Sequence, residues 1–120
     1  MFDSKFISRL SIGDFNDNGK IVNSKMSDGF TTVMVYADWC GHCNTAKPIY
    51  NDLGKACCCQ VQCAVIDSDA NAKLLERLNS VGITVDGFPT FLQFKDGKYH
   101  RTFEDSYSNK VALRNFIMGV

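Results

Sequence analysis

The sequence lacks the features that would assign it to several common classes of protein. Neither sign of charge is in excess, since 13 Lys and Arg residues balance 13 Asp and Glu residues. This balance argues against nucleic acid or an anionic membrane as the main partner. No apolar run approaches the roughly 20 residues of a membrane-spanning helix. Repeats, low-complexity segments and linkers are also lacking, so residues 1–120 are predicted to form a single domain.

The two ends of the chain lack recognisable address signals. Asp3, Lys5, Arg9 and Asp14 interrupt the apolar residues at positions 1–17, whereas a signal peptide has a continuous apolar core. The final segment, NFIMGV, is neither a retention nor a prenylation signal. A cytoplasmic location is therefore expected.

Cysteine, in contrast, is plentiful, but it is not spread along the chain as in a disulfide scaffold. Two of the six cysteines, Cys40 and Cys43, lie in the segment CGHC. The other four crowd together at Cys57, Cys58, Cys59 and Cys63. Disulfide-stapled domains space their cysteines to close long loops, and a chain with 45% apolar residues can bury a core without staples. The thiols are therefore expected to be free, catalytic or metal-binding.

The apolar pattern predicts strands that alternate with helices. Strands are expected at residues 5–12, 31–37, 61–67, 90–95 and 98–103, the last two joined by an Asp96-Gly97 turn of type I′. Helices are expected at residues 40–57, 70–81 and 109–118, the first with a kink at Pro48. Residues 13–29 are predicted to form a loop with at most a short helix. This order predicts an α/β fold in which helices cover both faces of a central mixed β-sheet.

Cys40 falls where a predicted strand ends and a helix begins. The unpaired N–H groups and the positive dipole end of a first helical turn stabilise a thiolate, which lowers the thiol pKa and creates a nucleophile near neutral pH. Cys43 lies three residues later on the same helix face, within reach of a disulfide. His42 can be partly cationic near neutrality and would favour the reduced form. The pair predicts attack by one thiolate, a mixed disulfide, and resolution by the second thiol.

A resemblance to the thioredoxin family is carried by four segments in the family's order: VYADWCGHC, KPIY, VID and GFPTFLQFKDG. The segment WCGHC is similar to the active site of protein disulfide isomerases, whereas thioredoxins themselves usually have Pro in place of His42. The match is strongest over residues 31–118 and implies a thioredoxin-like fold. The catalytic residues are then Cys40 as the exposed nucleophile, Cys43 as the resolving thiol, and His42. The resemblance also implies a cis Phe88-Pro89 bond that faces the disulfide. The substrate contacts that it implies come from Trp39, Gly41, Gly87, Phe88 and Pro89.

The sequence departs from the family beneath the predicted site. Met34 stands where family members carry a buried carboxylate, and Cys63 stands where they often carry Lys. Proton transfer at Cys43 is therefore expected to use water or His42 and to be slower than in family members. Isomerases also tend to carry a late arginine that tunes the resolving cysteine, and the segment FEDSYSNK holds none. Arg101 lies earlier, on a predicted strand, and is expected at the surface.

Other roles for the cysteines are weighed beside the redox one. Cys40 and Cys43 could be structural thiols or part of a zinc site, but the helix start and the surrounding motifs favour redox chemistry, and tetrahedral zinc needs four ligands. For the cluster from Cys57 to Cys63, a structural role, with Cys57 and Cys63 as small buried apolar side chains, is favoured over a second redox pair, an oxidative dimer contact or a metal site. No metal is assigned.

The favoured function is a thiol–disulfide oxidoreductase that acts on protein or peptide substrates without a bound cofactor. The expected location favours reduction, with recycling by a thioredoxin reductase or the glutathione system, whereas CGHC favours oxidation or isomerisation, so the direction is left open. A specialised cytoplasmic assembly process, such as that of a large virus, is one setting that fits. The alternative is a module that binds a peptide or a metal and keeps weak residual redox activity, which the loss of the buried acid and base favours.

Overall fold

The centre of the molecule is a mixed sheet. Within residues 2–57 and 59–120, which the computed structural model describes, five strands lie in the order β1-β3-β2-β4-β5. They are β1 (Ile7–Arg9), β2 (Phe30–Tyr36), β3 (Gln62–Asp67), β4 (Thr90–Lys95) and β5 (Lys98–Thr102). Strand β2 is parallel to β3 and antiparallel to β4. The sheet is therefore mixed, as the sequence predicts.

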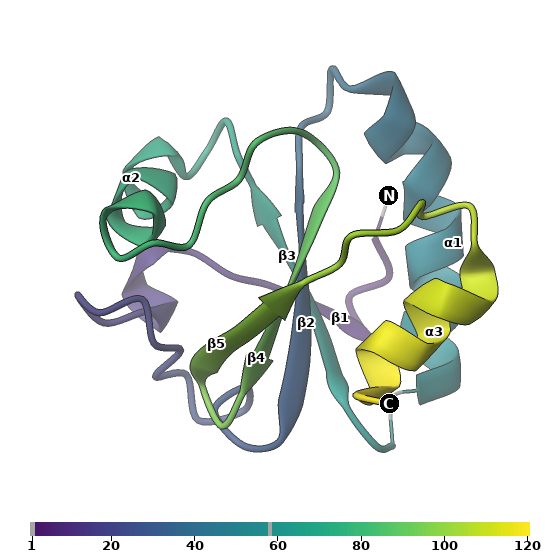
Figure 1. The fold of residues 1–120 in the computed structure, drawn as a ribbon, viewed down its shortest axis with the longest axis horizontal. Coiled ribbons are helices and arrows are strands. Elements are labelled where there is room, and N and C mark those ends of the chain that lie inside the picture. The colour runs from purple at the N-terminus through teal and green to yellow at the C-terminus, as the bar shows by residue number, and fades with distance from the viewer. Residues whose placement is uncertain (1, 58) are drawn as a thin grey trace.

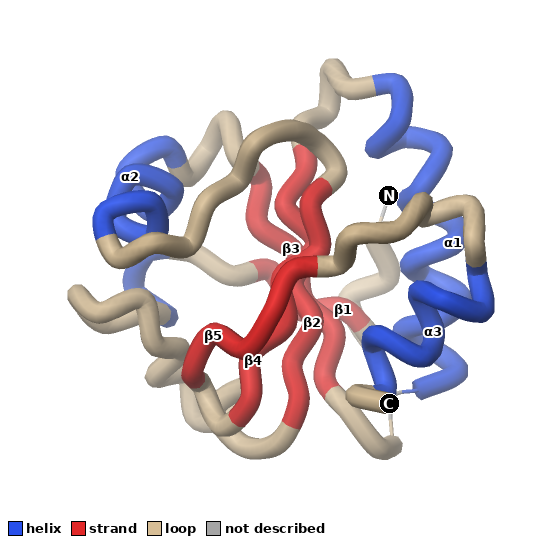
Figure 2. Tube along the Cα trace, in the orientation of Figure 1, coloured by secondary structure: helices blue, strands red, loops and turns tan. Residues whose placement is uncertain are grey.

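Helices cover both faces of this sheet. In the described part of the chain they are α1 (Gly41–Cys57), α2 (Ala72–Ser80) and α3 (Lys110–Met118). Helices α1 and α3 lie on one side of the sheet and α2 lies on the other, which gives three layers (Figure 1; Figure 2). None of these helices is long and apolar enough to cross a bilayer. The fold is thioredoxin-like α/β, as predicted.

The alternation of side chains along β2 explains why this strand is apolar on nearly every residue. Met34 and Tyr36 belong to the core cluster under α1 and α3, whereas Val33 and Val35 belong to the cluster under α2. Successive side chains of a strand point to opposite faces, so a strand that is covered on both sides is apolar throughout. Strand β2 is thus the central strand from which the chain passes into α1.

The structure corrects the bounds of two predicted elements: the helix expected at residues 70–81 is limited to Ala72–Ser80, and the first strand is shorter at both ends. Strand β1 contains only Ile7–Arg9, instead of residues 5–12, because only these residues lie opposite Cys63, Ala64 and Val65 of β3. The Leu10 N–H still bonds the Val65 carbonyl of β3 at 2.9 Å. Beyond Leu10 the chain leaves the sheet, and Ile12–Asp14 form a short 3-10 helix, which agrees with the short helix allowed for in the polar loop. The hairpin turn has positive φ at both Asp96 and Gly97, the signature of the predicted type I′ turn.

Strand register brings two distant segments to one end of the sheet. Val35, near the end of β2, lies opposite Thr90, the first residue of β4. The Phe88-Pro89 bond immediately before Thr90 is cis, as the resemblance implies. Residues 37–40, which lead from β2 into α1, therefore lie beside this Phe88-Pro89 segment.

Candidate active site

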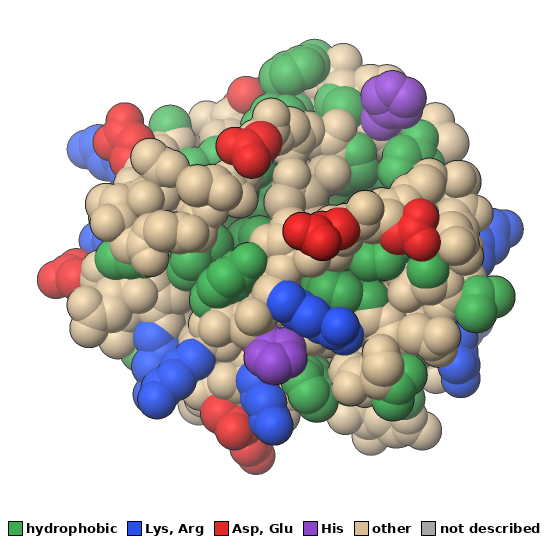
Figure 3. Space-filling model, in the orientation of Figure 1, with side chains coloured by type: hydrophobic (Ala, Val, Ile, Leu, Met, Phe, Trp, Pro, Cys, Tyr) green, Lys and Arg blue, Asp and Glu red, His purple; other side chains and the backbone are tan. Residues whose placement is uncertain are grey.

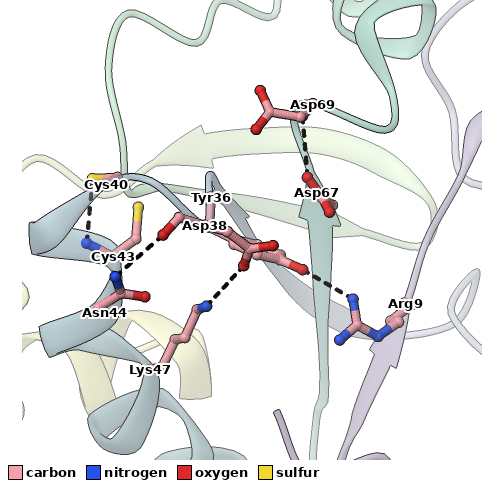
Figure 4. Close-up of polar contacts among 9 residues, drawn as sticks. All are labelled: Arg9, Tyr36, Asp38, Cys40, Cys43, Asn44, Lys47, Asp67 and Asp69. Atoms are coloured by element: carbon pink, nitrogen blue, oxygen red, sulfur yellow. Dashed lines mark hydrogen bonds and ion pairs between the residues drawn. The ribbon is translucent and has the colours of Figure 1, made fainter. Parts of the chain in front are cut away.

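Cys40 occupies the N-terminal capping position of α1. Its Sγ accepts a hydrogen bond from the backbone N–H of Cys43 at 3.3 Å, and its carbonyl accepts one from the N–H of Asn44 at 3.1 Å (Figure 4). A side-chain acceptor that bonds the third N–H of a helix is the geometry of an N-cap. The sulfur therefore lies at the positive end of the α1 dipole.

The surroundings shift the pKa values of the two thiols of the motif in opposite directions. Burial tends to raise the pKa of Cys40, but hydrogen bonds from the Cys43 side chain and from the backbone of Cys43 and His42 outweigh it, so the pKa is lowered. Burial, together with the adjacent Cys40 sulfur, raises the pKa of Cys43 to about 11. A single negative charge shared by the pair therefore resides on Cys40.

The implied exposure of Cys40 needs a correction. Cys40 is only 8% exposed and Cys43 is fully buried, so Cys40 is the more accessible of the two without being an exposed residue. The reason is its position: the Cys40 thiol donates a weak hydrogen bond of 3.5 Å to the Phe88 carbonyl and so faces the neighbouring loop. A substrate sulfur must approach along the narrow opening between the start of α1 and the Phe88-Pro89 segment.

An apolar rim borders this opening. Trp39 is 70% exposed and its ring meets Phe88 edge to face, with 5.8 Å between centroids. The indole Nε1–H points to the Asp69 carboxylate at 3.4 Å. Gly41 and Gly87 are exposed and Phe88 and Pro89 are half-buried. The five residues expected to contact substrate thus surround Cys40.

His42 is exposed on the first turn of α1, and its partner is a residue that the sequence did not indicate. Its Nδ1 lies 3.1 Å from the hydroxyl of Tyr107, and the two rings meet edge to face. Tyr107 belongs to the loop before α3, within the segment FEDSYSNK in which no arginine was found. An aromatic residue in that segment is the only signal that could have suggested the contact.

The sheet side of Cys43 is apolar. Met34 and Cys63 are buried in the same core cluster as Cys43. The Tyr50 hydroxyl lies 2.8 Å from the carbonyls of Thr32 and Ala64, and burial raises the pKa of Tyr50, so this group stays neutral. The two positions where the resemblance leads one to expect an acid and a base therefore carry neither a carboxylate nor an amine here.

A charged pair lies instead on the helix side of the motif. The Lys47 ammonium on α1 lies 3.1 Å from the carboxylate of Asp38, which precedes Trp39 in the loop after β2 (Figure 4). The Asp38 side chain is 73% exposed, and its carboxylate nevertheless holds this cation. The Asp38 carbonyl accepts a hydrogen bond from the Asn44 side chain at 3.2 Å.

The second group of cysteines lies at the opposite end of α1. Cys57 and Cys63 are buried among apolar side chains, Cys59 is exposed, and Cys58 lies outside the described residues. Burial raises the pKa of Cys57. Among residues 2–57 and 59–120, no three His, Cys, Asp or Glu side chains come together in a way that could hold a metal ion.

A polar hollow of about 1100 Å³ adjoins the site without containing it. Its lining includes Pro89, Thr90, Arg101 and Glu104, whereas Cys40 and Cys43 lie outside it. Acidic, basic and apolar side chains mix across the face in Figure 3. The thiols lie outside this hollow, next to the apolar rim that Trp39 and Phe88 form.

A dithiol whose first cysteine caps the helix after the central strand, opposite a cis-proline segment, defines a thioredoxin-fold protein with a CXXC motif. The family model for thioredoxin matches residues 14–118. The chain therefore belongs to the thioredoxin family, a family of thiol–disulfide oxidoreductases, and its CGHC motif has disulfide-isomerase character.

Similar proteins include both isomerases and a small viral protein. Protein disulfide-isomerase erp38 of Neurospora crassa is 38% identical over 68% of this chain and 23% of its own length. Protein disulfide-isomerase A4 of Bos taurus is 34% identical over 82% of this chain and 16% of its own length. The chain thus spans about a quarter or less of these isomerases. A putative thioredoxin-like protein, 453L, of Invertebrate iridescent virus 6 is 25% identical over 99% of this chain and 100% of its own length.

Solved structures share the fold. The J-Trx1 fragment of ERdj5 has a TM-score of 0.75 at 19% identity and covers 98% of this chain and 52% of that chain. Human ERp44, form I, has a TM-score of 0.74 at 20% identity and covers 94% of this chain and 29% of that chain. At this identity the likeness concerns the fold alone.

Proposed function

We propose that this protein exchanges dithiol for disulfide with protein or peptide substrates through Cys40 and Cys43. The observation that carries the proposal is the position of the Cys40 sulfur, which accepts the Cys43 N–H at the start of α1 while Cys43 stays a buried thiol. One thiolate and one thiol, three residues apart, are the two reactants that stepwise disulfide exchange requires.

In the reducing direction, the Cys40 thiolate attacks one sulfur of a substrate disulfide. A Cys40–substrate S–S bond forms, the substrate S–S bond breaks, and the departing sulfur takes a proton from water. Cys43 then gives its proton to water, and its thiolate attacks the Cys40 sulfur, so that the Cys40–Cys43 bond forms and the Cys40–substrate bond breaks. The substrate leaves with both sulfurs reduced, and the protein keeps the two-electron oxidation as a Cys40–Cys43 disulfide. The oxidising direction reverses these steps.

The surroundings of Cys40 support an extended polypeptide as the substrate. Trp39 and Phe88 offer an apolar rim, and Gly87 next to Phe88 is exposed, so an extended substrate strand can lie along this segment. The regenerating partner proposed for a reductant is a thioredoxin reductase or glutathione.

The compartment and setting stay predictions. The proposed location is cytoplasmic, and a viral assembly process is one proposed setting, of which the similarity to the viral thioredoxin-like protein supports only the viral part. The direction of exchange depends on the reduction potential of the Cys40–Cys43 pair relative to the surrounding thiol pool, for which about 30 mV corresponds to about 1.4 kcal/mol.

Insulin reduction with dithiothreitol tests the activity. The protein should accelerate precipitation of the insulin B chain, and Cys40→Ser should abolish the acceleration. A parent protein without activity would instead support the second candidate, a peptide-binding module, which the neutral sheet side of Cys43 favours.

A further inference from the structure

We propose that Lys47, held in place by Asp38, is a positioning residue that supplies from the helix side the charge that Cys43 lacks on its sheet side. The inference rests on the proposed function, because it concerns the step in which Cys43 resolves the mixed disulfide. In this proposal, α1 and the loop before it place a charged group near Cys43, whereas the sheet places only Met34 and Cys63 there.

The placement of Lys47 is the first observation. Lys47 lies four residues after Cys43, so the two side chains share one face of α1. Its side chain is only 14% exposed, although lysine side chains are almost always solvated. The side chain is therefore folded back along the helix toward the loop that carries the motif (Figure 4).

Several contacts keep the ammonium there. It lies 3.1 Å from the Asp38 carboxylate, 5.0 Å from the centroid of the Tyr36 ring and 5.6 Å from that of Phe2. A solvated ion pair alone contributes little stability, but aromatic faces add attraction for a partly desolvated cation. The Asn44 side chain bonds the Asp38 carbonyl, which ties the carboxylate-bearing loop to α1. The charge is thus confined near the first turns of the helix.

The other charged groups around this position come from three elements. Asp38 approaches from the loop after β2, and the Cys40 thiolate lies at the start of α1. Arg9 of β1 donates to the Tyr36 hydroxyl at 2.9 Å, on the same aromatic ring that contacts Lys47. Asp38 compensates Lys47 only in part, because its carboxylate is largely in water.

The effect on Cys43 follows from the sign of the charge. Burial and the Cys40 sulfur raise the pKa of the Cys43 thiol, whereas the Lys47 charge and a backbone hydrogen bond from Ala37 lower it. During resolution Cys43 must lose its proton and attack as a thiolate. A fixed cation on the same helix face stabilises that thiolate, so resolution proceeds at a lower pH than burial alone would allow.

A chromogenic aromatic disulfide, 5,5′-dithiobis(2-nitrobenzoate), separates the two steps in one experiment. Attack by Cys40 releases a first coloured thiolate, and resolution by Cys43 releases a second. Cys40→Ser measures the reaction of the remaining cysteines, which is subtracted. Each rate is followed by stopped flow across pH 6 to 10 in about 0.1 M salt, so that solvated charges are screened.

Lys47→Met should slow the second release about three- to tenfold at neutral pH and shift its pH profile upward, because one pKa unit corresponds to a tenfold change in thiolate fraction. The first release should stay within about twofold. Lys47→Arg should restore the profile. Lys55→Met, which removes an exposed lysine of the same helix, is the matched control. Asp38→Asn removes the carboxylate that holds the Lys47 ammonium in place. It should also shift the pH profile of the second release, and this test does not depend on the folding of Lys47→Met.

If Lys47→Met and Asp38→Asn both fold and neither shifts the pH profile of the second release, Lys47 has only a packing role and the inference is overturned. Failure of Lys47→Arg to restore the profile would do the same. Failure of the proposed function looks different, because the first release would then be the same in the parent protein and in Cys40→Ser.

Discussion

The two ends of α1 carry cysteines with opposite properties. At its start, the Cys40 sulfur accepts a backbone N–H and the pKa of its thiol is lowered. At its end, Cys57 is buried among apolar side chains and the pKa of its thiol is raised, although Arg114 offsets part of the burial. Both residues are among the buried side chains, at 8% and 3% exposure.

This difference shows that the place of a thiol on a helix decides its reactivity here more than its burial does. The start of a helix offers unpaired N–H groups to a thiolate, whereas the end offers carbonyl groups that repel it. Six cysteines in the sequence therefore do not make six equivalent redox groups.

The largest expected difference is in insulin-reducing turnover between two variants that each remove one thiol, at the start or at the end of α1. Cys40→Ser should reduce insulin-reducing turnover to the rate without protein, because a hydroxyl does not ionise near neutrality. Cys57→Ala should keep most of the turnover and lower the free energy of unfolding by about 1 kcal/mol. Comparable losses of turnover in two folded variants would remove the distinction between the ends.

The alkylation rates of Cys40 and Cys57 should differ by about tenfold or more. At pH 7, Cys40 should react with iodoacetamide at least about ten times faster than Cys57, since thiolate is the reacting form. The rate at Cys40 should reach half its plateau below the ordinary thiol pKa, and the rate at Cys57 above it. Site-resolved mass spectrometry of quenched samples measures both profiles, and a reversed order would contradict the account.

A carboxylate placed beneath the start of α1 should change resolution a few-fold. Met34→Glu should speed release of the mixed disulfide, because it gives Cys43 a nearby proton acceptor, and should lower the free energy of unfolding by about 2–4 kcal/mol. Met34→Gln is the neutral control of similar size. If the two variants exchanged disulfides equally fast, the expectation of slow proton transfer at Cys43 would have no support.

The contact between His42 and Tyr107 should have the smallest effect. Tyr107→Phe removes the hydroxyl that lies 3.1 Å from the imidazole and should change the insulin-reduction rate by about twofold or less. Tyr99→Phe, at another tyrosine hydroxyl, is the control. The nitrogen chemical shifts of His42 should change in the first variant only; unchanged shifts would show that the contact does not form in solution.

Much of the fold could be predicted because it depends on local patterns. The apolar run of β2, the helical spacing after Cys40 and the Asp96-Gly97 turn each specify an element on their own. The extent of β1 was wrong, because its length depends on which residues find partners on β3, and pairing is a tertiary property.

The parts of the site that could not be predicted depend on contacts between distant residues. Tyr107 meets His42 across 65 positions of sequence. Lys47 is half-buried because its ammonium lies over the rings of Phe2 and Tyr36. Arg101, expected at the surface, is half-buried because it bonds the Gln93 side chain and lies over the Phe116 ring. In each case a long side chain could adopt several orientations, and its contacts in the assembled fold determine which one it adopts.

The most direct test of the central claim is to trap the substrate on the protein. The Cys43→Ser variant cannot resolve a mixed disulfide, so it should accumulate one with a disulfide-bonded peptide, and peptide mapping by mass spectrometry should find the link on Cys40. A link that forms mainly on Cys57, Cys59 or Cys63, or no link at all, would contradict the assignment of Cys40 as the nucleophile.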